Sequence, residues 1–247
     1  MVHALPAADF DRLKRLDTCS VSNAIERLNV RLRNEGFMHG TVSCMFPKMR
    51  PMLGYAVTAT AKSSMQPIGG GWYYDRLDWW TSFLDVPAPR VMVLQDVDRV
   101  PAFGAFVGEV HANIAAAFEC VGCVTNGAVR DLPAIEQLGF QLFAGGVSPS
   151  HAYAHIVEWG LPVEIGGLKI QKGDLVHGDC HGVQLIPLDI AAAIPNIADE
   201  LQRDEQTIIA ACQTQRFSVD ALGKAIERIR RSQMESPGSA ASQNERA

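Results

Sequence analysis

Hydrophobic residues follow two different spacings along most of the chain. Residues 53–62 (LGYAVTATAK) are β-branched and alternating, and residues 90–95 (RVMVLQ) form a continuous apolar run, so both predict strands, the second a buried parallel one. Further on, helical and strand spacings take turns: helix at 110–118, strand at 121–125, helix at 132–138 and strand at 140–143. This alternation predicts β-α-β units and therefore an α/β fold.

Helical patterns also precede this region. Residues 9–28 indicate one or two helices, with Thr18 or Ser20 as the N-cap of the second. After the glycine triplet at 69–71, an amphipathic helix is expected. Its inward face is predicted to consist of Leu77, Trp80 and Leu84.

The pattern changes again towards the end of the chain. From Pro162, short apolar runs separated by glycine turns predict an antiparallel β layer. Residues 199–212 and 218–231 then indicate two amphipathic helices, the second capped by Ser218. Residues 232–247 are small, polar and broken by glycine and proline, and they predict a disordered tail.

The composition is that of an ordinary soluble globular protein, with 247 residues of which 47% are hydrophobic and 20% charged. One domain is expected over residues 1–231. A net charge of -5 without a basic stripe speaks against nucleic acid as a partner and favours a small molecule or a protein. The chain shows neither a signal peptide nor the roughly 18 consecutive apolar residues of a membrane helix. We therefore expect a cytoplasmic protein that does not bind membranes.

Six cysteines are too few and too scattered for a disulfide framework in a chain of this length, which fits a reducing compartment. Cys120 and Cys123 form the one CxxC pair. A redox motif of this kind opens a helix, whereas Cys123 lies in a predicted strand, and no second CxxC completes a zinc site. Two buried thiols are the expected outcome, and redox or metal chemistry is the alternative.

An arginine and an aspartate stand side by side where a predicted strand ends. Arg130 and Asp131 follow the Asn126-Gly127 break. The carboxyl end of a parallel strand is where α/β folds place ligands. A guanidinium can bind a carboxylate through two parallel hydrogen bonds, and a carboxylate can hold a metal ion. The alternative is structural, with Asp131 as the N-cap of the next helix and Arg130 as a surface residue.

A second polar element, residues 108–111 (GEVH), starts the alanine-rich helix. A helix N-terminus with a glycine offers backbone N–H groups to an anion. If the strands at 91–94 and 121–125 are neighbours, this helix start and the Arg-Asp turn face the same crevice. Together they would define a site for a small oxo acid with a divalent ion. Alternatively, Glu109 is only a first-turn acid favoured by the helix dipole.

Together these segments resemble the RraA-like superfamily, which includes the 4-hydroxy-4-methyl-2-oxoglutarate aldolases. The resemblance runs from about Leu16 to Pro187 and rests on TCSVSNA at 18–24, GYAVT at 54–58, NGAVRD at 126–131 and DCHGV at 179–183. It implies an α/β fold, a swivelling β/β/α domain with N-terminal and C-terminal helical extensions, assembled as a homotrimer or hexamer. It also implies a site near a subunit boundary and a Mg²⁺ or Mn²⁺ ion.

The resemblance gives particular residues a role. Arg130 resembles the family's substrate-carboxylate arginine, and Asp131 resembles its metal ligand. Glu109 stands where the aldolases carry an acid that acts through metal-bound water, so Glu109 and Arg130 are the expected catalytic residues. The loop whose backbone amides hold the substrate corresponds to Gly108, Glu109, Val110 and His111.

The implied activity is that of a divalent-metal-dependent pyruvate aldolase, a class II carbon-carbon lyase. Retro-aldol cleavage of a 4-hydroxy-2-oxo acid would release pyruvate, and decarboxylation of oxaloacetate would use the same enolate. The rival interpretation is a non-catalytic RraA-like regulator that binds a ribonuclease or another protein. The presence of both Arg130 and Asp131 favours the enzyme.

Four histidine and aspartate positions depart from the family pattern or add to it. His111 stands where many of these aldolases have leucine, and it is either a substrate-side specificity residue or a helix-surface histidine. His177, Asp179 and His181 alternate in a strand-like segment, which would point all three to one face. They form a candidate second metal site, although the family has only the aspartate there.

Overall fold

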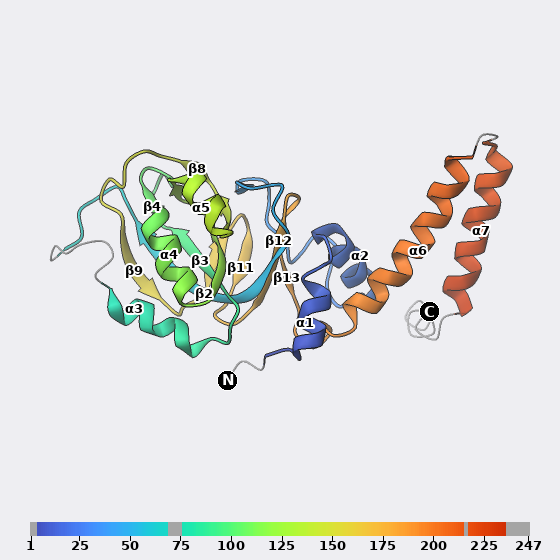
Figure 1. The fold of residues 1–247 in the computed structure, drawn as a ribbon, viewed down its shortest axis with the longest axis horizontal. Coiled ribbons are helices and arrows are strands. Elements are labelled where there is room, and N and C mark those ends of the chain that lie inside the picture. The colour runs from blue at the N-terminus through green and yellow to red at the C-terminus, as the bar shows by residue number, and fades with distance from the viewer. Residues whose placement is uncertain (1–3, 69–75, 215–216, 236–247) are drawn as a thin grey trace, which may run out of the picture. The chain divides into compact units, whose positions relative to one another are not determined.

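The computed structural model describes residues 4–68, 76–214 and 217–235, and the chain divides into two compact units, Met1–Pro195 and Asn196–Ala247. All strands of the described residues belong to the first unit, together with helices α1 to α5. Figure 1 labels most of these elements. The fold class predicted from the sequence, α/β with helices before and after the sheet, is confirmed.

The first unit is built on one mixed sheet of eight strands. Seven of them lie in the order β1-β7-β5-β3-β2-β12-β13, and β9 pairs with β2. Their bounds are Ser43–Cys44 (β1), Met52–Lys62 (β2), Arg90–Asp96 (β3), Cys120–Thr125 (β5), Gln141–Ala144 (β7), His155–Trp159 (β9), Leu175–Asp179 (β12) and Gly182–Ile186 (β13). β2, β3, β5 and β7 are parallel, which confirms the predicted β-α-β units.

The last two strands correct one prediction. The sequence predicts a separate antiparallel layer after Pro162, but β12 and β13 extend the main sheet. β12 pairs antiparallel with β2, with Leu175 opposite Tyr55, and β13 pairs antiparallel with β12. The N–H and C=O groups along the edge of β2 need partners, and β12 supplies them. Only β10 (Val163–Ile165) and β11 (Leu168–Ile170) form a ribbon of their own.

The segment before β2 nearly closes this sheet into a barrel. Met38 donates its backbone N–H to Val183 of β13 at 2.9 Å, and Phe37 forms a bridge with Gln184. A few residues later, the Met45 N–H binds the Leu142 carbonyl of β7 at 2.8 Å. Residues 37–45 therefore connect the two ends of the strand order. The connection satisfies backbone groups that an open sheet would leave unpaired.

The interior of the barrel is filled by branched and aromatic side chains. The cluster includes Val91, Val93, Val124, Phe143, Ile165 and Val176, all buried. β3 is buried over nearly its whole length because neighbouring strands cover its edges and side chains cover its faces. This explains why its sequence is continuously apolar instead of alternating.

The N-terminal helices are α1 (Ala7–Leu13) and α2 (Thr18–Leu28). The expected N-cap of α2, Thr18 or Ser20, is wrong: the cap is Asp17, whose carboxylate accepts the Ser20 N–H at 2.7 Å. Thr18 and Ser20 lie inside the first turn. From the position before the turn, the Asp17 side chain can reach an N–H group that has no partner within the helix.

The buried face of α3 (Leu77–Thr81) also differs from the prediction. Trp80 is buried as expected, but Leu77 and Leu84 are 76% and 63% exposed. Trp79 and Phe83 take their places, and the chain continues after α3 as a 3₁₀ turn, Ser82–Asp85. Indole and phenyl rings remove more apolar surface from water than leucine does, so the helix turns its aromatic side inward.

Helices α4 (Glu109–Ala117) and α5 (Leu132–Leu138) pack against each other. They lie side by side in Figure 1. α5 has the predicted bounds and ends as predicted at Gly139, which has a φ of 74°. Glycine adopts this left-handed conformation without the steric cost that a side chain would add.

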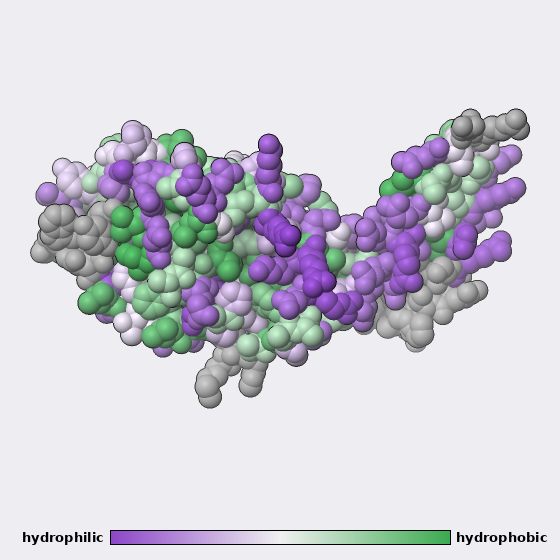
Figure 2. Space-filling view, viewed as in Figure 1, coloured by the Kyte–Doolittle hydropathy of each residue, from purple (hydrophilic) through white to green (hydrophobic). Residues whose placement is uncertain are grey.

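The second unit contains α7 (Val219–Glu235) and most of α6 (Ile194–Cys212). Ser218 caps α7 as predicted, because its hydroxyl accepts the Ala221 N–H at 3.2 Å. Figure 2 shows mainly hydrophilic side chains along the outer side of α7. No helix in the described ranges has the length and apolar character needed to cross a membrane. Residues 236–247, which include most of the predicted tail, lie outside the described residues.

Candidate active site

Three short parallel strands carry the polar elements singled out in the sequence. β4 (Ala105–Val107), β6 (Ala128–Val129) and β8 (Gly146–Val147) form a small sheet in the order β4-β6-β8. Parallel strands place their carboxyl ends at one edge. Residues 108–111 follow β4 and the Arg-Asp pair follows β6, so both polar elements leave the same edge. β3 and β5 are neighbours, as this arrangement requires.

Asp131 joins the two polar elements. Its Oδ2 accepts the backbone N–H of Glu109 at 3.1 Å, and both of its oxygens lie 3.2 Å from Nε of Arg130. The side chain makes no capping hydrogen bond to α5, the helix that it precedes. Asp131 thus occupies the N-cap position of α5, as the structural alternative had it, but its carboxylate binds the start of α4 instead of capping α5.

The backbone and charge of Asp131 fit a functional position. Its φ of 56° is left-handed, a conformation that costs a non-glycine residue energy and is common at functional sites. Partial burial would raise the pKa of the carboxyl group, but the Glu109 amide and the Arg130 guanidinium outweigh it and lower the pKa below its usual value. Asp131 is therefore ionised at neutral pH, and its side chain is 34% exposed.

Gly108 allows the close approach of these groups. A Cβ atom on Gly108 would lie 2.6 Å from Oδ2 of Asp131 and 3.0 Å from Cγ of Arg130. The first of these separations is shorter than real Cβ contacts, so any side chain here would displace the carboxylate. The glycine at the N-cap of α4 is thus explained by packing against the Arg-Asp turn.

The Arg130 side chain is held from two directions. Nε binds Asp131, while Nη1 lies 3.2 Å from the Pro149 carbonyl oxygen and 3.2 Å from Nδ1 of His151. Nη2 is not among the donors of these bonds, and the side chain is 30% exposed. A guanidinium fixed in this way can still bind an anionic ligand through its remaining N–H groups.

His151 is a site residue that the sequence analysis missed. Burial lowers its pKa, and the neighbouring Arg130 lowers it further. Arginine can only donate, so the neutral imidazole of His151 is the acceptor, with Nδ1 at 3.2 Å and Nε2 at 3.4 Å from Nη1 of Arg130. The signal that could have found this residue is the segment SPSH at 148–151, which follows β8 at the same edge.

The N-terminus of α4 lies next to the Arg-Asp turn. The first helical hydrogen bond runs from Ala112 N–H to the Gly108 carbonyl, so Glu109 and Val110 lie in the first turn, where the helix dipole is positive. The Glu109 and Val110 side chains are exposed. The loop predicted to bind the substrate therefore lies beside the Arg-Asp turn, whereas the structure does not place the Glu109 carboxylate against Arg130.

The side chain of His111 corrects both sequence-based interpretations. It is fully buried, with its ring centroid 4.6 Å from that of Phe106 and 6.0 Å from that of Trp80. It lies in the aromatic cluster beneath α4 and neither faces a substrate nor lies on the helix surface. The imidazole takes the place of an apolar side chain on the inward face of the helix.

The candidate second metal site predicted from His177, Asp179 and His181 is wrong for His177. His177 is fully buried, and its Nε2 lies 3.1 Å from the Leu16 carbonyl oxygen, where it supports the turn before α2. His181 lies in the turn after β12 and is not on the strand face. Asp179 and His181 do come together, and their third neighbour is Cys180.

The CxxC pair is confirmed as two buried thiols. Cys120 and Cys123 are free and buried, and burial raises the pKa of Cys120 to about 12 and that of Cys123 as well. Thiols of this kind are protonated at neutral pH and unreactive.

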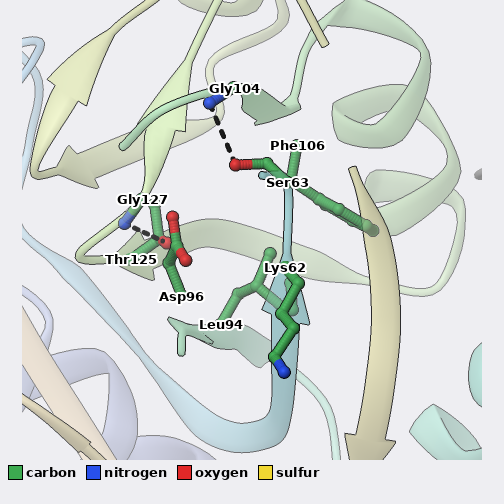
Figure 3. A pocket seen from close by; sticks show the side chains of 9 residues that line it. Lys62, Ser63, Leu94, Asp96, Gly104, Phe106, Thr125 and Gly127 are labelled. Carbon is green, nitrogen blue, oxygen red and sulfur yellow. Dashed lines mark hydrogen bonds between the residues drawn. The ribbon is translucent and has the colours of Figure 1, made fainter. Parts of the chain in front are cut away.

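A small cavity lies where β2, β3 and β5 end. It is lined by residues that include Lys62, Ser63, Asp96 and Thr125 (Figure 3). Ser63 accepts the Gly104 N–H at 3.0 Å, and Thr125 accepts the Gly127 N–H at 2.9 Å. The interior of the cavity has room for about one water molecule. The cavity is therefore too small for an oxo acid, which directs attention to the open edge of the β4-β6-β8 sheet.

Comparison with known proteins identifies the family. A family model described as "RraA-like: Aldolase/RraA" matches residues 18–185, a range that includes both polar elements of the site. The chain belongs to the RraA-like family. A relative in Halalkalibacterium halodurans, named "Putative 4-hydroxy-4-methyl-2-oxoglutarate aldolase", is 30% identical over 103 residues, which is 41% of this chain and 49% of the relative. The matched region thus spans about half of that protein.

Two solved structures show the RraA-like fold over most of the chain. An uncharacterized protein from Pseudomonas syringae pv. tomato has a TM-score of 0.70 at 21% identity and covers 92% of this chain and 97% of its own. Streptomyces coelicolor RraAS2, described as an unusual member of the RNase ES inhibitor RraA protein family, has a TM-score of 0.64 at 20% identity, with 83% and 96% covered. At these identities the likeness establishes the fold.

Proposed function

We propose that this RraA-like protein is a divalent-metal-dependent aldolase that cleaves a 4-hydroxy-2-oxo acid to release pyruvate and also decarboxylates oxaloacetate. The observation that supports this most is the Asp131 carboxylate, which binds both the Arg130 guanidinium and the first amide of α4. A fixed cation, an ionised carboxylate and the positive end of a helix dipole then lie together in one partly exposed place. These are the groups that an oxo acid and a hard metal ion require.

Asp131 fits the role of a metal ligand. Mg²⁺ and Mn²⁺ prefer carboxylate oxygens, and Mg²⁺ typically binds through one or two carboxylates while keeping several waters. Asp131 is ionised and partly exposed, so it would hold the ion at the mouth of the crevice. A bound ion would supply Lewis-acid stabilisation of the negative charge that develops on the oxo acid.

The other groups bind and orient the substrate. Arg130, fixed by Asp131, Pro149 and His151, would bind the carboxylate next to the 2-oxo group. The N-terminus of α4, which begins at Glu109, adds partial positive charge. Because these donors are in place before the substrate arrives, the site does not have to reorganise during the reaction.

Glu109 is the proposed base. Retro-aldol cleavage removes the proton of the 4-hydroxyl group while the bond between C3 and C4 breaks, and the electron pair stays on the pyruvate half. Glu109, exposed at the start of α4, takes that proton through a water and returns a proton to C3. Decarboxylation of oxaloacetate breaks the bond to CO₂ and needs no hydroxyl proton to be removed.

The proposal is tested by measuring pyruvate release from a panel of 4-hydroxy-2-oxo acids and from oxaloacetate, with Mg²⁺ or Mn²⁺ and with a chelator. Metal-dependent release is expected from at least one substrate, and Asp131→Ala should abolish it. The variant should stay folded, because loss of one helix-start acceptor costs about 1 kcal/mol. No release from any substrate with either metal would refute the enzyme and favour the protein-binding regulator.

We also propose that the chain assembles as a homotrimer or hexamer with the crevice near a subunit boundary. Large apolar side chains around the β4-β6-β8 edge support this, since Phe103 is 61%, Val147 62% and Val110 53% exposed. Light scattering in solution tests it. A monomer across the concentrations used for activity would overturn it.

A further inference from the structure

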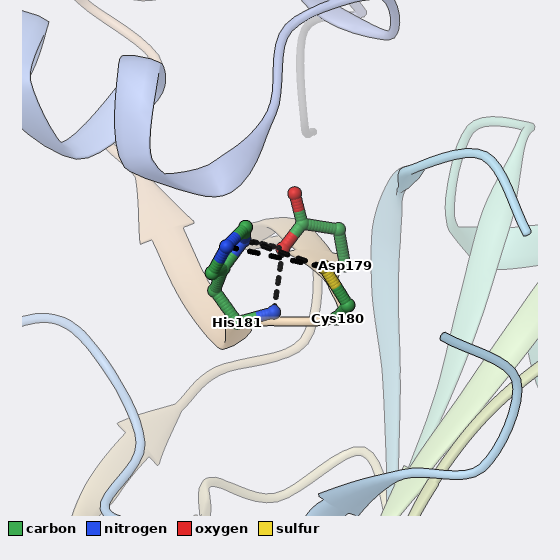
Figure 4. A group of neighbouring side chains, drawn as sticks. All are labelled: Asp179, Cys180 and His181. Carbon is green, nitrogen blue, oxygen red and sulfur yellow. Dashed lines mark hydrogen bonds and ion pairs between the residues drawn. The ribbon is translucent and has the colours of Figure 1, made fainter. Parts of the chain in front are cut away.

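A group of possible metal ligands lies far from the crevice in the sheet. Asp179 is the last residue of β12, and Cys180 and His181 form the turn that leads to β13 (Figure 4). Because Gly178 pairs with Met52, this turn lies beside the first residue of β2. The parallel strands end at the opposite edge of the sheet. The turn is therefore a feature separate from the carboxyl ends of β2, β3 and β5.

The three side chains turn their donor atoms toward one another. Nδ1 of His181 lies 3.0 Å from Oδ1 of Asp179 and 3.5 Å from Sγ of Cys180, and the three ligand atoms lie within 4.8 Å of one another. In a tetrahedral zinc site, bond lengths of about 2.0 Å to oxygen and nitrogen and about 2.3 Å to sulfur put these pairs about 3.3 Å and 3.5 Å apart. The two pairs that include His181 are therefore close to the spacing of a tetrahedral site.

The aspartate is fixed in place by the start of α2. Oδ2 of Asp179 accepts the Thr18 N–H at 2.8 Å, and Oδ1 accepts the His181 N–H at 2.8 Å. Burial would raise the pKa of this carboxyl group, but these amides outweigh it and lower the pKa. A buried, ionised oxygen held by second partners is typical of the way proteins orient metal ligands.

Two more thiols lie near the turn, and they come from distant parts of the sequence. Cys19 follows Thr18 in α2, and Cys44 pairs with Phe143, whose ring lies against Gly178. The surroundings of the group are therefore rich in sulfur, which favours thiophilic metals.

We propose that Asp179, Cys180 and His181 bind a Zn²⁺ ion, with water at the fourth position. Cys180 and His181 are exposed, so both the ion and the water can reach the site. Binding releases the thiol proton of Cys180, while His181 binds as the neutral ring through Nδ1 and carries its one proton on Nε2. Thiolate and imidazole are poor ligands for Mg²⁺, which keeps this ion distinct from the one proposed at Asp131.

The site is tested on the full-length protein, stripped with a chelator and kept reduced, by titration with ZnCl₂ against a chromophoric chelator. One Zn²⁺ per chain is expected. Cys180→Ser and His181→Gln should each weaken binding by more than about 100-fold, since even loss of an outer-shell partner costs 10- to 100-fold. The matched control is Cys212→Ser, at an exposed cysteine of α6, which should bind like the parent. Asp131→Ala should also bind normally.

A second measurement needs no variant. Zn²⁺ should slow the alkylation of Cys180 by iodoacetamide, followed by peptide mass spectrometry, and should leave Cys212 unaffected. With Co²⁺ in place of Zn²⁺, a thiolate-to-cobalt absorption band should appear and be lost in Cys180→Ser. Zinc binding that survives both ligand substitutions, binding lost in Asp131→Ala, or no protection of Cys180 would each overturn the proposal.

Discussion

Arg130 is the residue whose role depends most on shape as well as charge. Its guanidinium meets Asp131, Pro149 and His151 at once, which a single ammonium group cannot do. We expect Arg130→Lys to lower kcat/KM for pyruvate release almost as much as Arg130→Ala, by about 10²-fold or more, since charge-assisted bidentate bonds are worth several kcal/mol. Steady-state kinetics of both variants measure this. Near-normal kinetics for the lysine variant would mean that Arg130 supplies only positive charge.

Glu109 separates the two reactions of the proposed enzyme. Glu109→Gln keeps the size of the side chain and removes the base. The variant should lose about 10²- to 10⁴-fold in aldol cleavage, the usual contribution of a positioned acid or base, and much less in oxaloacetate decarboxylation. Parallel assays of the two reactions on one preparation make the comparison. Equal losses would instead place Glu109 in a structural or metal-binding role.

The residues found from the sequence share a property that the missed ones lack. Arg130 and Asp131 are adjacent in the chain and follow a recognisable strand, so local pattern suffices to select them. His151 reaches Arg130 only because β8 pairs with β6, a contact that no periodicity reveals. His111 fails for the opposite reason: its helix was predicted, but the inward rotation that buries the ring depends on Trp80 and Phe106.

At the scale of elements, the start of α4 packs so closely against the turn after β6 that no side chain fits at Gly108. Gly108→Ala would push the Asp131 carboxylate aside, so activity should fall by at least about 10-fold, because misplaced catalytic groups are costly. The φ of Gly108 is extended, -133°, so the alanine causes no backbone strain and stability should change little. Thermal unfolding and pyruvate release, measured together, check this.

Gly139→Ala is the matched control at the end of α5. A Cβ atom there meets nothing within 4 Å, but the φ of 74° strains an alanine. Stability should therefore drop by about 1 kcal/mol while activity stays. Loss of stability without loss of activity in Gly108→Ala would contradict the packing argument.

Long elements were predictable and short ones were not. The bounds of α5 and the positions of β2, β3 and β5 follow from runs of five or more residues with a clear period. β4, β6 and β8 have two or three residues each, too few to show any period, yet they align the site. The inward face of α3 could not be predicted because apolar residues lie on more than one side of this helix. Which of them are buried depends on the residues that pack against it.

At the scale of the whole molecule, His177 couples stability to pH. Burial lowers its pKa to about 4, against 6.5 for the free group. The unfolded chain therefore binds the proton more tightly, and the free energy of unfolding should decrease as pH falls from about 6.5 to 4, by about 3 kcal/mol. Denaturant unfolding across this range measures it. His177→Gln should flatten the dependence, whereas the same change at the exposed His39 should not.

The near closure of the main sheet could not have been predicted from local patterns. Residues 37–45 contain little periodicity, but their backbone bonds connect β13 to β7 and nearly close the sheet into a barrel. Likewise, the β12 segment reads as an antiparallel strand, and only the free edge of β2 decides that it joins the main sheet. The fold class came from alternation of elements, and its closure depends on pairings between residues far apart in the chain.

The small β4-β6-β8 sheet means that the candidate site and the hydrophobic core are built on different sheets. The large sheet and its core of branched side chains provide the stability. The segments that form the candidate site follow β4, β6 and β8, which have only two or three residues each. Substitutions in the three segments after β4, β6 and β8 would change which ligand binds without disturbing the strand pairings of the large sheet. A scaffold arranged in this way separates what binds from what folds, since the cation and the carboxylate can be replaced without changing the residues of the core.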